Sequence, residues 1–350
     1  MLGSDRAEQY DIRAQDKPSE AMIRKPAWPQ TLFPQLRSES GTFESGRLSF
    51  LASGEARRSG PEILARCGGL GCRRGKGLRG SGTKKIVRVL GCNPGISTGP
   101  GTNTYLLLGD APLLIDTGAG VPAYEAALRA NLSEQSVKGL QAVLVTHDHI
   151  DHVGGVEQID RIFPKARVWK MTHPTSEPPG GFEALQDGDK IMVNGHALQA
   201  IFTPGHAVDH LCFYLEGERV LFSGDLILGT GTTVIPVEGG DMTAYLASLR
   251  RLLEWDIRAI YPGHGPVIHR PREYILQYLR HREMREEQIL ALLKDGVRDV
   301  PTLVKRIYAE VPQADHGLAQ QTVLSHLIKL EREGIVEKEE QVGVSLFGLR

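Results

Sequence analysis

Short apolar runs, each ending in a loop of glycine and polar residues, recur along most of the chain and predict buried strands. The clearest run is Gln141-Ala-Val-Leu-Val-Thr146, which is rich in β-branched residues. Similar runs begin at Leu198, Val220 and Ile257. A helical pattern over residues 157–163 follows the first run. The pattern therefore predicts four strands that end in loops, the first of which leads into a helix.

Side chains that bind metal ions follow each of these four runs. They are His147, His149, Asp151, His152, His206, Asp225 and His264. All 12 histidines lie after residue 146, and a random scatter would rarely concentrate them in this way. Neutral imidazole and carboxylate groups are ligands that suit Zn²⁺, and the glycines in these loops let the backbone approach an ion closely. The spacing predicts one metal-binding rim that four strand ends supply.

The other histidines carry a weaker signal. Most of them fit surface or hydrogen-bonded structural positions, namely His173, His196, His269, His281, His316 and His326. His210 follows His206 closely and is either another structural residue or a support for the metal site.

Four motifs around the predicted ligands resemble those of the metallo-β-lactamase superfamily. The motifs are Thr146-His-Asp-His-Ile-Asp-His152, Thr203-Pro-Gly-His206, Ser223-Gly-Asp225 and Pro262-Gly-His264. The resemblance implies an α/β fold, a four-layer αβ/βα sandwich with two zinc ions at one sheet edge. It implies a first zinc ion on His147, His149 and His206, and a second on Asp151, His152 and His264. Asp225 would bridge the two ions together with a shared water or hydroxide.

Asp116, in Leu114-Ile-Asp-Thr-Gly118, resembles the superfamily's early aspartate that orients the histidine loop. Its local sequence fits a turn or cap residue nearly as well. Asn103, in Gly101-Thr-Asn-Thr, is a candidate for contacting substrate beside the metals, and a turn-forming asparagine is the alternative.

A narrower resemblance covers the chain from about Val87 to near its C-terminus. Val87-Arg-Val-Leu-Gly-Cys-Asn-Pro-Gly95, Gly229-Thr-Gly-Thr-Thr233 and Tyr261-Pro-Gly-His-Gly-Pro-Val-Ile-His269 are similar to the β-lactamase-like protein 2 family, within the glyoxalase II-related group. That resemblance implies a di-zinc endoribonuclease that cleaves single-stranded RNA through a metal-bridging hydroxide, in mitochondria. Asp151 and Asp225 would fix the metals, and either could accept a proton.

Thioesterases of the glyoxalase II or fungal polyketide-pathway type share much of this pattern, so an acyl thioester is the alternative substrate.

A non-catalytic metal-binding subunit is disfavoured because no ligand position is missing. Flavodiiron proteins place glutamate where His149 stands, which favours zinc here. Only 38 residues separate Asp225 from His264, too few for the inserted domain of the nucleases that resemble cleavage factors.

Three helical patterns and an alternating pair predict a winged-helix module at the C-terminus. The helices are expected over residues 272–293, 302–308 and 319–333, and the hairpin over 335–339 and 342–347. On the third helix, His326, Lys329 and Arg332 are offset by Glu331 and Glu333, which makes a weak phosphate-binding face. We therefore expect the module to contact substrate or pack on its neighbour, with no sequence-specific DNA binding. Such modules also dimerise, so a homodimer is a further expectation.

Charge divides the chain into a basic beginning and an acidic remainder. Residues 1–85 hold 16 Lys and Arg against 9 Asp and Glu, whereas residues 86–350 hold 25 against 33. The Gly- and Arg-rich start predicts a disordered extension over 1–85, with a nucleic-acid-binding arm as the alternative. The expected catalytic domain is 86–271 and the C-terminal domain 272–350. The acidic remainder counts modestly against an RNA substrate.

The sequence carries few recognisable targeting signals. No apolar run reaches 18 residues, which predicts no membrane span. The opening Met1-Leu-Gly-Ser-Asp-Arg-Ala-Glu lacks a signal-peptide core and is acidic for a mitochondrial presequence. The family resemblance implies the mitochondrial matrix, and the cytoplasm is the alternative expectation.

Overall fold

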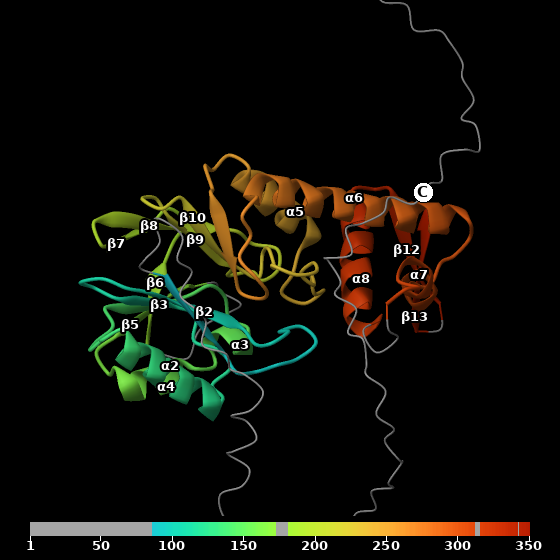
Figure 1. The fold of residues 1–350 in the computed structure, drawn as a ribbon. Coiled ribbons are helices and arrows are strands. Elements are labelled where there is room, and N and C mark those ends of the chain that lie inside the picture. The colour runs from blue at the N-terminus through green and yellow to red at the C-terminus, as the bar shows by residue number, and fades with distance from the viewer. Residues whose placement is uncertain (1–85, 173–180, 312–315, 342) are drawn as a thin grey trace, which may run out of the picture. The chain divides into compact units, whose positions relative to one another are not determined.

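Two β-sheets face one another in the computed structural model, which describes residues 86–172, 181–311, 316–341 and 343–350 (Figure 1). The predicted basic extension at 1–85 and His173 lie outside the described residues. The first sheet has six strands in the order β1-β2-β3-β4-β5-β6, and the second has five in the order β11-β10-β9-β8-β7.

The strands of the first sheet are short and largely buried. They are β1 (Ile86–Leu90), β2 (Asn103–Leu107), β3 (Leu113–Ile115), β4 (Ala142–Val145), β5 (Arg167–Met171) and β6 (Phe182–Leu185). From β3 to β6 the neighbours run parallel, with Ile115 opposite Leu144 and Leu144 opposite Trp169. Strands buried on both faces need near-continuous apolar sequence, which explains the Ala-Val-Leu-Val run of β4.

The second sheet is antiparallel except at one edge. Its strands are β7 (Lys190–Val193), β8 (His196–Phe202), β9 (Leu211–Leu215), β10 (Val220–Gly224) and β11 (Ala259–Pro262). β10 and β11 run parallel, so their carboxyl ends reach the same edge of the sheet.

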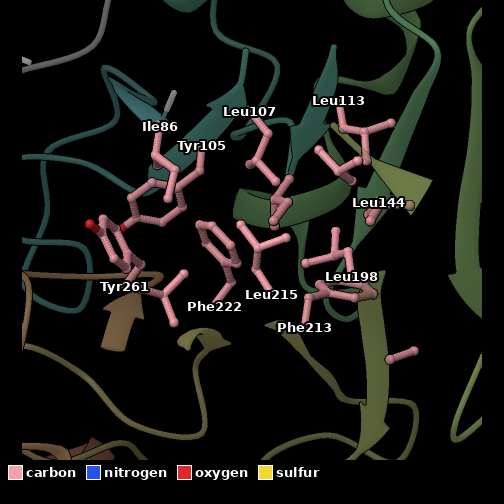
Figure 2. Close-up of a cluster of buried hydrophobic side chains, with 14 of the residues drawn as sticks. Ile86, Tyr105, Leu107, Leu113, Leu144, Leu198, Phe213, Leu215, Phe222 and Tyr261 are labelled. Atoms are coloured by element: carbon pink, nitrogen blue, oxygen red, sulfur yellow. The ribbon is translucent and has the colours of Figure 1, made fainter. Parts of the chain in front are cut away.

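Helices cover the outer face of each sheet, which completes four layers. The helices α2 (Pro122–Glu134) and α4 (Val156–Ile162) pack on the first sheet through a cluster that includes Leu128, Ile159 and Val143. The helices α5 (Met242–Leu252) and α6 (Pro271–Lys294) pack on the second sheet. Side chains from the inner faces of both sheets interdigitate between them, as Figure 2 shows for Leu144, Phe213 and Phe222. The predicted four-layer αβ/βα sandwich is confirmed.

The C-terminal residues form the predicted winged helix. It consists of α7 (Val300–Ile307), α8 (His316–Arg332) and the hairpin of β12 (Val336–Gln341) and β13 (Val344–Leu349). The first part of α6 packs on the sandwich, with Ile275 buried there, and its last part packs in the winged-helix core, where Ile289 is fully buried. The predicted domain boundary after residue 271 therefore falls in the first turn of α6, a helix whose side chains pack in the core of the sandwich and in the core of the winged helix. Among the described residues, no helix combines the length and apolar character needed to cross a membrane.

Candidate metal centre

All seven predicted metal-binding side chains lie together at one edge of the sandwich. His147 and His149 follow β4, and Asp151 and His152 lie in the one-turn helix α3 (Ile150–Val153) directly after them. The other three, His206, Asp225 and His264, follow β8, β10 and β11. Their ligand atoms form three groups, each within 4.8 Å: His147–His149–His206, His147–His152–Asp225 and Asp151–His152–His264. Loops from both sheets thus converge as the spacing predicts.

The first group brings three imidazole nitrogens into contact. His149 Nδ1 lies 3.0 Å from His147 Nε2 and 3.0 Å from His206 Nε2. The proton of His206 is on Nδ1, because that atom lies 2.8 Å from the carbonyl oxygen of Val234, which can only accept. The Nε2 lone pair of His206 therefore points at the other two rings.

The proton of His147 is fixed in a similar way. Its Nδ1 lies 3.0 Å from Thr146 Oγ1, and that hydroxyl lies 3.0 Å from both carboxylate oxygens of Asp116. The hydroxyl donates to the carboxylate, so it accepts from His147 Nδ1. The Nε2 atom of His147 is left with a lone pair that faces His149.

The second ligand group, taken as Asp151, His152 and His264, brings its own carboxylate close to that of Asp225. His264 Nε2 lies 3.2 Å from Asp151 Oδ2 and 3.3 Å from Asp225 Oδ1, and His152 Nε2 lies 3.4 Å and 3.3 Å from the same two oxygens. The other oxygen of Asp225 lies 3.7 Å from His206 Nε2. Asp225 thus lies between the two groups.

The residues present fit bound cations. In the part of the chain that the structure describes, His152 Nε2 and Asp225 Oδ1 are buried without a hydrogen-bond partner. One proton on His149 Nδ1 can serve only one of the His147 and His206 lone pairs at a time, so a cation among these atoms would satisfy what hydrogen bonds leave unpaired. Four-coordinate zinc with Zn–N distances of about 2.0–2.1 Å separates its ligand atoms by roughly 3.3 Å, close to the 3.0 Å seen in the first group. Imidazole and carboxylate also suit zinc chemically.

The electrostatics of the two groups differ. Burial lowers the pKa of His147 well below its usual value and that of His206 to about 4, so these rings are neutral, as metal ligands must be. In the second group burial opposes the charge on His264, but Asp225 and Asp151 outweigh it and raise the pKa to about 9. The carboxylates of Asp151 and Asp225 therefore stabilise a positive charge where His264 lies between them.

Asp116 holds the histidine loop. It adopts the left-handed conformation with φ 59°, and its Oδ1 accepts the backbone N–H of Thr146 at 2.8 Å. Its Oδ2 lies 2.8 Å from His152 Nδ1, which must donate and so keeps its proton away from the metal side. These contacts favour the orienting role over the turn-or-cap alternative.

His210 holds the backbone of Asp225 through a hydrogen bond. Its Nε2 accepts the backbone N–H of Asp225 at 3.1 Å, and its Nδ1 lies 2.9 Å from Thr203 Oγ1. Both nitrogens are thus used, and His210 is fully buried beside the cluster. The structure places this residue in the supporting position that was one of its two sequence interpretations.

Asn103 occupies an interior position. Its Nδ2 donates to the carbonyl oxygens of Pro262 and Gly265, 2.9 Å from each, on either side of His264. Its side chain is buried, with 1% of the residue exposed. Substrate contact by Asn103 stays a prediction, and these hydrogen bonds favour a role in shaping the His264 loop.

Sequence reasoning missed Thr102 and the backbone of the β10–α5 loop. Thr102 Oγ1 donates to Asp151 Oδ2 at 2.9 Å, although the two residues are 49 positions apart. Val234 contributes only its carbonyl oxygen to His206, so no side-chain signal could have identified it. Thr102 lies within the Gly101-Thr-Asn-Thr motif, but nothing in that motif marked it as a partner of Asp151.

Two glycines are required by close packing around the centre. A Cβ on Gly263 would lie 2.6 Å from Asp225 Oδ1 and 2.8 Å from His152 Cε1. Gly205 has φ +133°, and its Cβ would lie 2.3 Å from the Tyr245 backbone. A side chain at position 263 would therefore displace predicted ligands, and one at position 205 would clash with α5 directly beside His206.

Comparison with protein families finds two matches along the chain. The model described as the metallo-beta-lactamase superfamily matches residues 97–264, a range that includes all seven predicted ligands. The model of the beta-lactamase associated winged helix domain matches residues 300–344.

Individual proteins extend these likenesses over most of the chain. The sequence is 39% identical to a beta-lactamase-like protein 2 homolog of Caenorhabditis elegans, over 72% of this chain and 86% of that protein. It is 40% identical to a protein of Aspergillus fumigatus named atrochrysone carboxyl ACP thioesterase, over 63% of this chain and 68% of that protein. The crystal structure of a metallo-beta-lactamase family protein from Thermus thermophilus aligns with a TM-score of 0.66 at 26% identity, covering 76% of this chain and 99% of that one.

Proposed function

This chain belongs to the metallo-beta-lactamase superfamily, and from that membership we propose that it is a di-zinc hydrolase that cleaves single-stranded RNA. The observation that supports the proposal is a set of ligand atoms with more lone pairs than available donors. His147 Nε2 and His206 Nε2 each lie 3.0 Å from His149 Nδ1, which carries at most one proton to share between them. Among the described residues, His152 Nε2 and Asp225 Oδ1 are buried without a hydrogen-bond partner. Such atoms are costly in a protein interior unless an ion binds them.

Two bound zinc ions would lower the pKa of a water molecule and polarise the bond to be broken. The protein's part is to hold the ligands rigidly and in the right tautomer. Asp116 does so for His152, and the Val234 carbonyl does so for His206. His210 fixes the backbone of Asp225, whose carboxylate lies between the two groups.

Asp151 and Asp225 are the proposed proton acceptors. Burial opposes the charge of Asp151, but the hydrogen bond with His264 and the charge of His152 lower its pKa to about 2. The side chain of Asp151 is 21% exposed, the more accessible of the two carboxylates. The low pKa keeps Asp151 ionised near neutral pH, as a metal ligand must be, and makes it a weak base. Its proposed part as proton acceptor therefore rests on its position beside the metals and on its accessibility.

RNA is proposed as substrate because of the likeness to the β-lactamase-like protein 2 family, which extends over 72% of the chain. A pair of metal ions suits in-line attack on a phosphodiester, since one ion can face the attacking oxygen and the other the leaving oxygen. We expect products with a 5′-phosphate and a 3′-hydroxyl.

The second candidate is an acyl thioesterase. It is favoured by 40% identity to the protein named atrochrysone carboxyl ACP thioesterase, and by the excess of acidic residues in 86–350. The same seven side chains would serve both reactions, so the ligands alone do not distinguish a phosphodiester from a thioester.

Parallel assays on a 5′-labelled single-stranded RNA and on an acyl thioester distinguish the two candidates. We expect zinc-dependent RNA cleavage by the wild-type protein and its loss in Asp225→Ala. Exposed Asp256→Asn is the matched control and should cleave normally, because its side chain is 75% exposed and pairs only with Arg219 in the described contacts. Thioester turnover without RNA cleavage would replace the nuclease proposal, and RNA cleavage that survives Asp225→Ala would reject it.

A further inference from the structure

The loop of residues 228–237, between β10 and α5, contacts ligands from both metal groups. Near its start, the backbone N–H of Gly229 donates to the carbonyl oxygen of His264 at 2.7 Å. Further along, the Val234 carbonyl accepts from His206 Nδ1 at 2.8 Å, and Thr233 Oγ1 lies 3.2 Å from the same nitrogen. The position of this loop therefore determines where two predicted ligands stand.

Helix α6 holds the first half of the 228–237 loop. Tyr278 Oη accepts the N–H of Leu228 at 3.0 Å and donates to the Gly231 carbonyl at 2.8 Å. One turn later, Arg282 Nη2 donates to the Thr233 carbonyl at 2.5 Å. Arg282 is 1% exposed, and its guanidinium also lies 5.2 Å from the centre of the Tyr245 ring. A buried arginine at this position is expensive to desolvate, so its hydrogen bond to the loop is strongly favoured.

Helix α8 of the winged helix holds the second half. Ser325 Oγ donates to the Ile235 carbonyl at 2.8 Å, and Thr322 Oγ1 lies 3.4 Å from the Ile235 nitrogen as its acceptor. Gln321 Oε1 accepts from the N–H of Val237 at 3.2 Å. Gln321 and Thr322 lie four and three residues before Ser325, so both neighbour Ser325 on the same side of the helix.

We propose that α6 and α8 position His206 for metal binding through the 228–237 loop, with Arg282 and Ser325 as the positioning residues. Val234, which sets the proton of His206, lies between Thr233 and Ile235, the two residues whose carbonyls Arg282 and Ser325 hold. The winged helix is thereby a structural part of the metal centre. This inference rests on the metal centre of the proposed function and does not depend on which substrate is cleaved.

Zinc affinity of the purified full chain, measured by competition with a chromophoric chelator, tests the inference. We expect wild-type protein to bind two ions, and Ser325→Ala and Arg282→Lys each to weaken one of them about ten-fold or more, as losing an outer support of a ligand does. Ser325→Thr keeps the hydroxyl and should restore tight binding.

Matched controls come from the same domain. Arg298→Lys and Ser345→Ala alter side chains that bond to Phe347 and Glu340, away from the loop, and should leave both zinc constants unchanged. Melting temperatures of the zinc-free variants report stability separately. Unchanged zinc affinity in Ser325→Ala and Arg282→Lys overturns the inference, as does an equal loss in the controls. A wild-type protein that binds no zinc overturns the proposed metal centre itself.

Discussion

Replacing Asp116 with asparagine isolates the support of the histidine loop from the metal ligands. The carboxylate accepts the Thr146 N–H at 2.8 Å through Oδ1 and the His152 Nδ1 proton at 2.8 Å through Oδ2, while buried at 2% exposure. An asparagine keeps one acceptor oxygen and replaces the other with an amide that donates. If that oxygen still accepts from the Thr146 N–H, the amide NH₂ faces the Nδ1–H of His152, and two donors then point at one another.

This opposition has two outcomes, and both weaken the centre. A buried donor left unsatisfied costs about 1–3 kcal/mol of stability. Alternatively His152 shifts its proton to Nε2, the atom that faces Asp225 at 3.3 Å, and loses the lone pair that would bind a metal. We therefore expect Asp116→Asn to weaken binding of the second zinc ion by about 10–100-fold.

Calorimetric zinc titration and chelator competition measure this loss, with melting of the zinc-free protein as the stability readout. Asp256→Asn is the control, because that side chain is 75% exposed. If Asp116→Asn melts lower but binds both zinc ions as tightly as wild type, Asp116 is a cap alone, and the orienting role assigned to it is wrong.

Three further predictions address the fold and the metals. Lys170 and Asp209 form a fully buried ion pair, so Lys170→Met should lower the free energy of unfolding by about 3–5 kcal/mol in urea denaturation; an unchanged midpoint would contradict this. Burial lowers the pKa of His281 to about 3; because the unfolded state binds the proton first, stability should fall as pH drops from about 6.5 towards 3. The free energy of unfolding of His281→Gln should fall less steeply over that range, and a parallel decline would refute the assignment. Removing zinc with a chelator should lower the melting temperature, since ligand at 1,000 times its Kd stabilises by about 4 kcal/mol; a melting temperature independent of zinc would count against a bound metal.

The elements that carry the site were largely predictable from the sequence. The apolar run of 141–146 became β4 (Ala142–Val145), and the pattern at 319–333 became α8 (His316–Arg332). In both cases the hydrophobic period is strong and the boundaries are marked by polar residues or glycine. The loop expected after β4 instead contains the one-turn helix α3, which brings Asp151 and His152 close to His264.

Contacts between distant segments were beyond the reach of sequence patterns. Thr102 binds Asp151 across 49 residues, and Ser325 binds Ile235 across 90. Neither residue has a local signal, because serine and threonine occur in every kind of loop and helix. Backbone acceptors such as the Val234 carbonyl are independent of residue type and appear only once the chain is folded.

Zinc content of the folded protein tests the central claim most directly. After reconstitution with zinc and removal of unbound metal, elemental analysis should find about two zinc ions per wild-type chain and fewer in Asp225→Ala, whose carboxylate lies between both groups. Fewer than one ion per folded wild-type chain, or an equal content in the two proteins, would contradict the account.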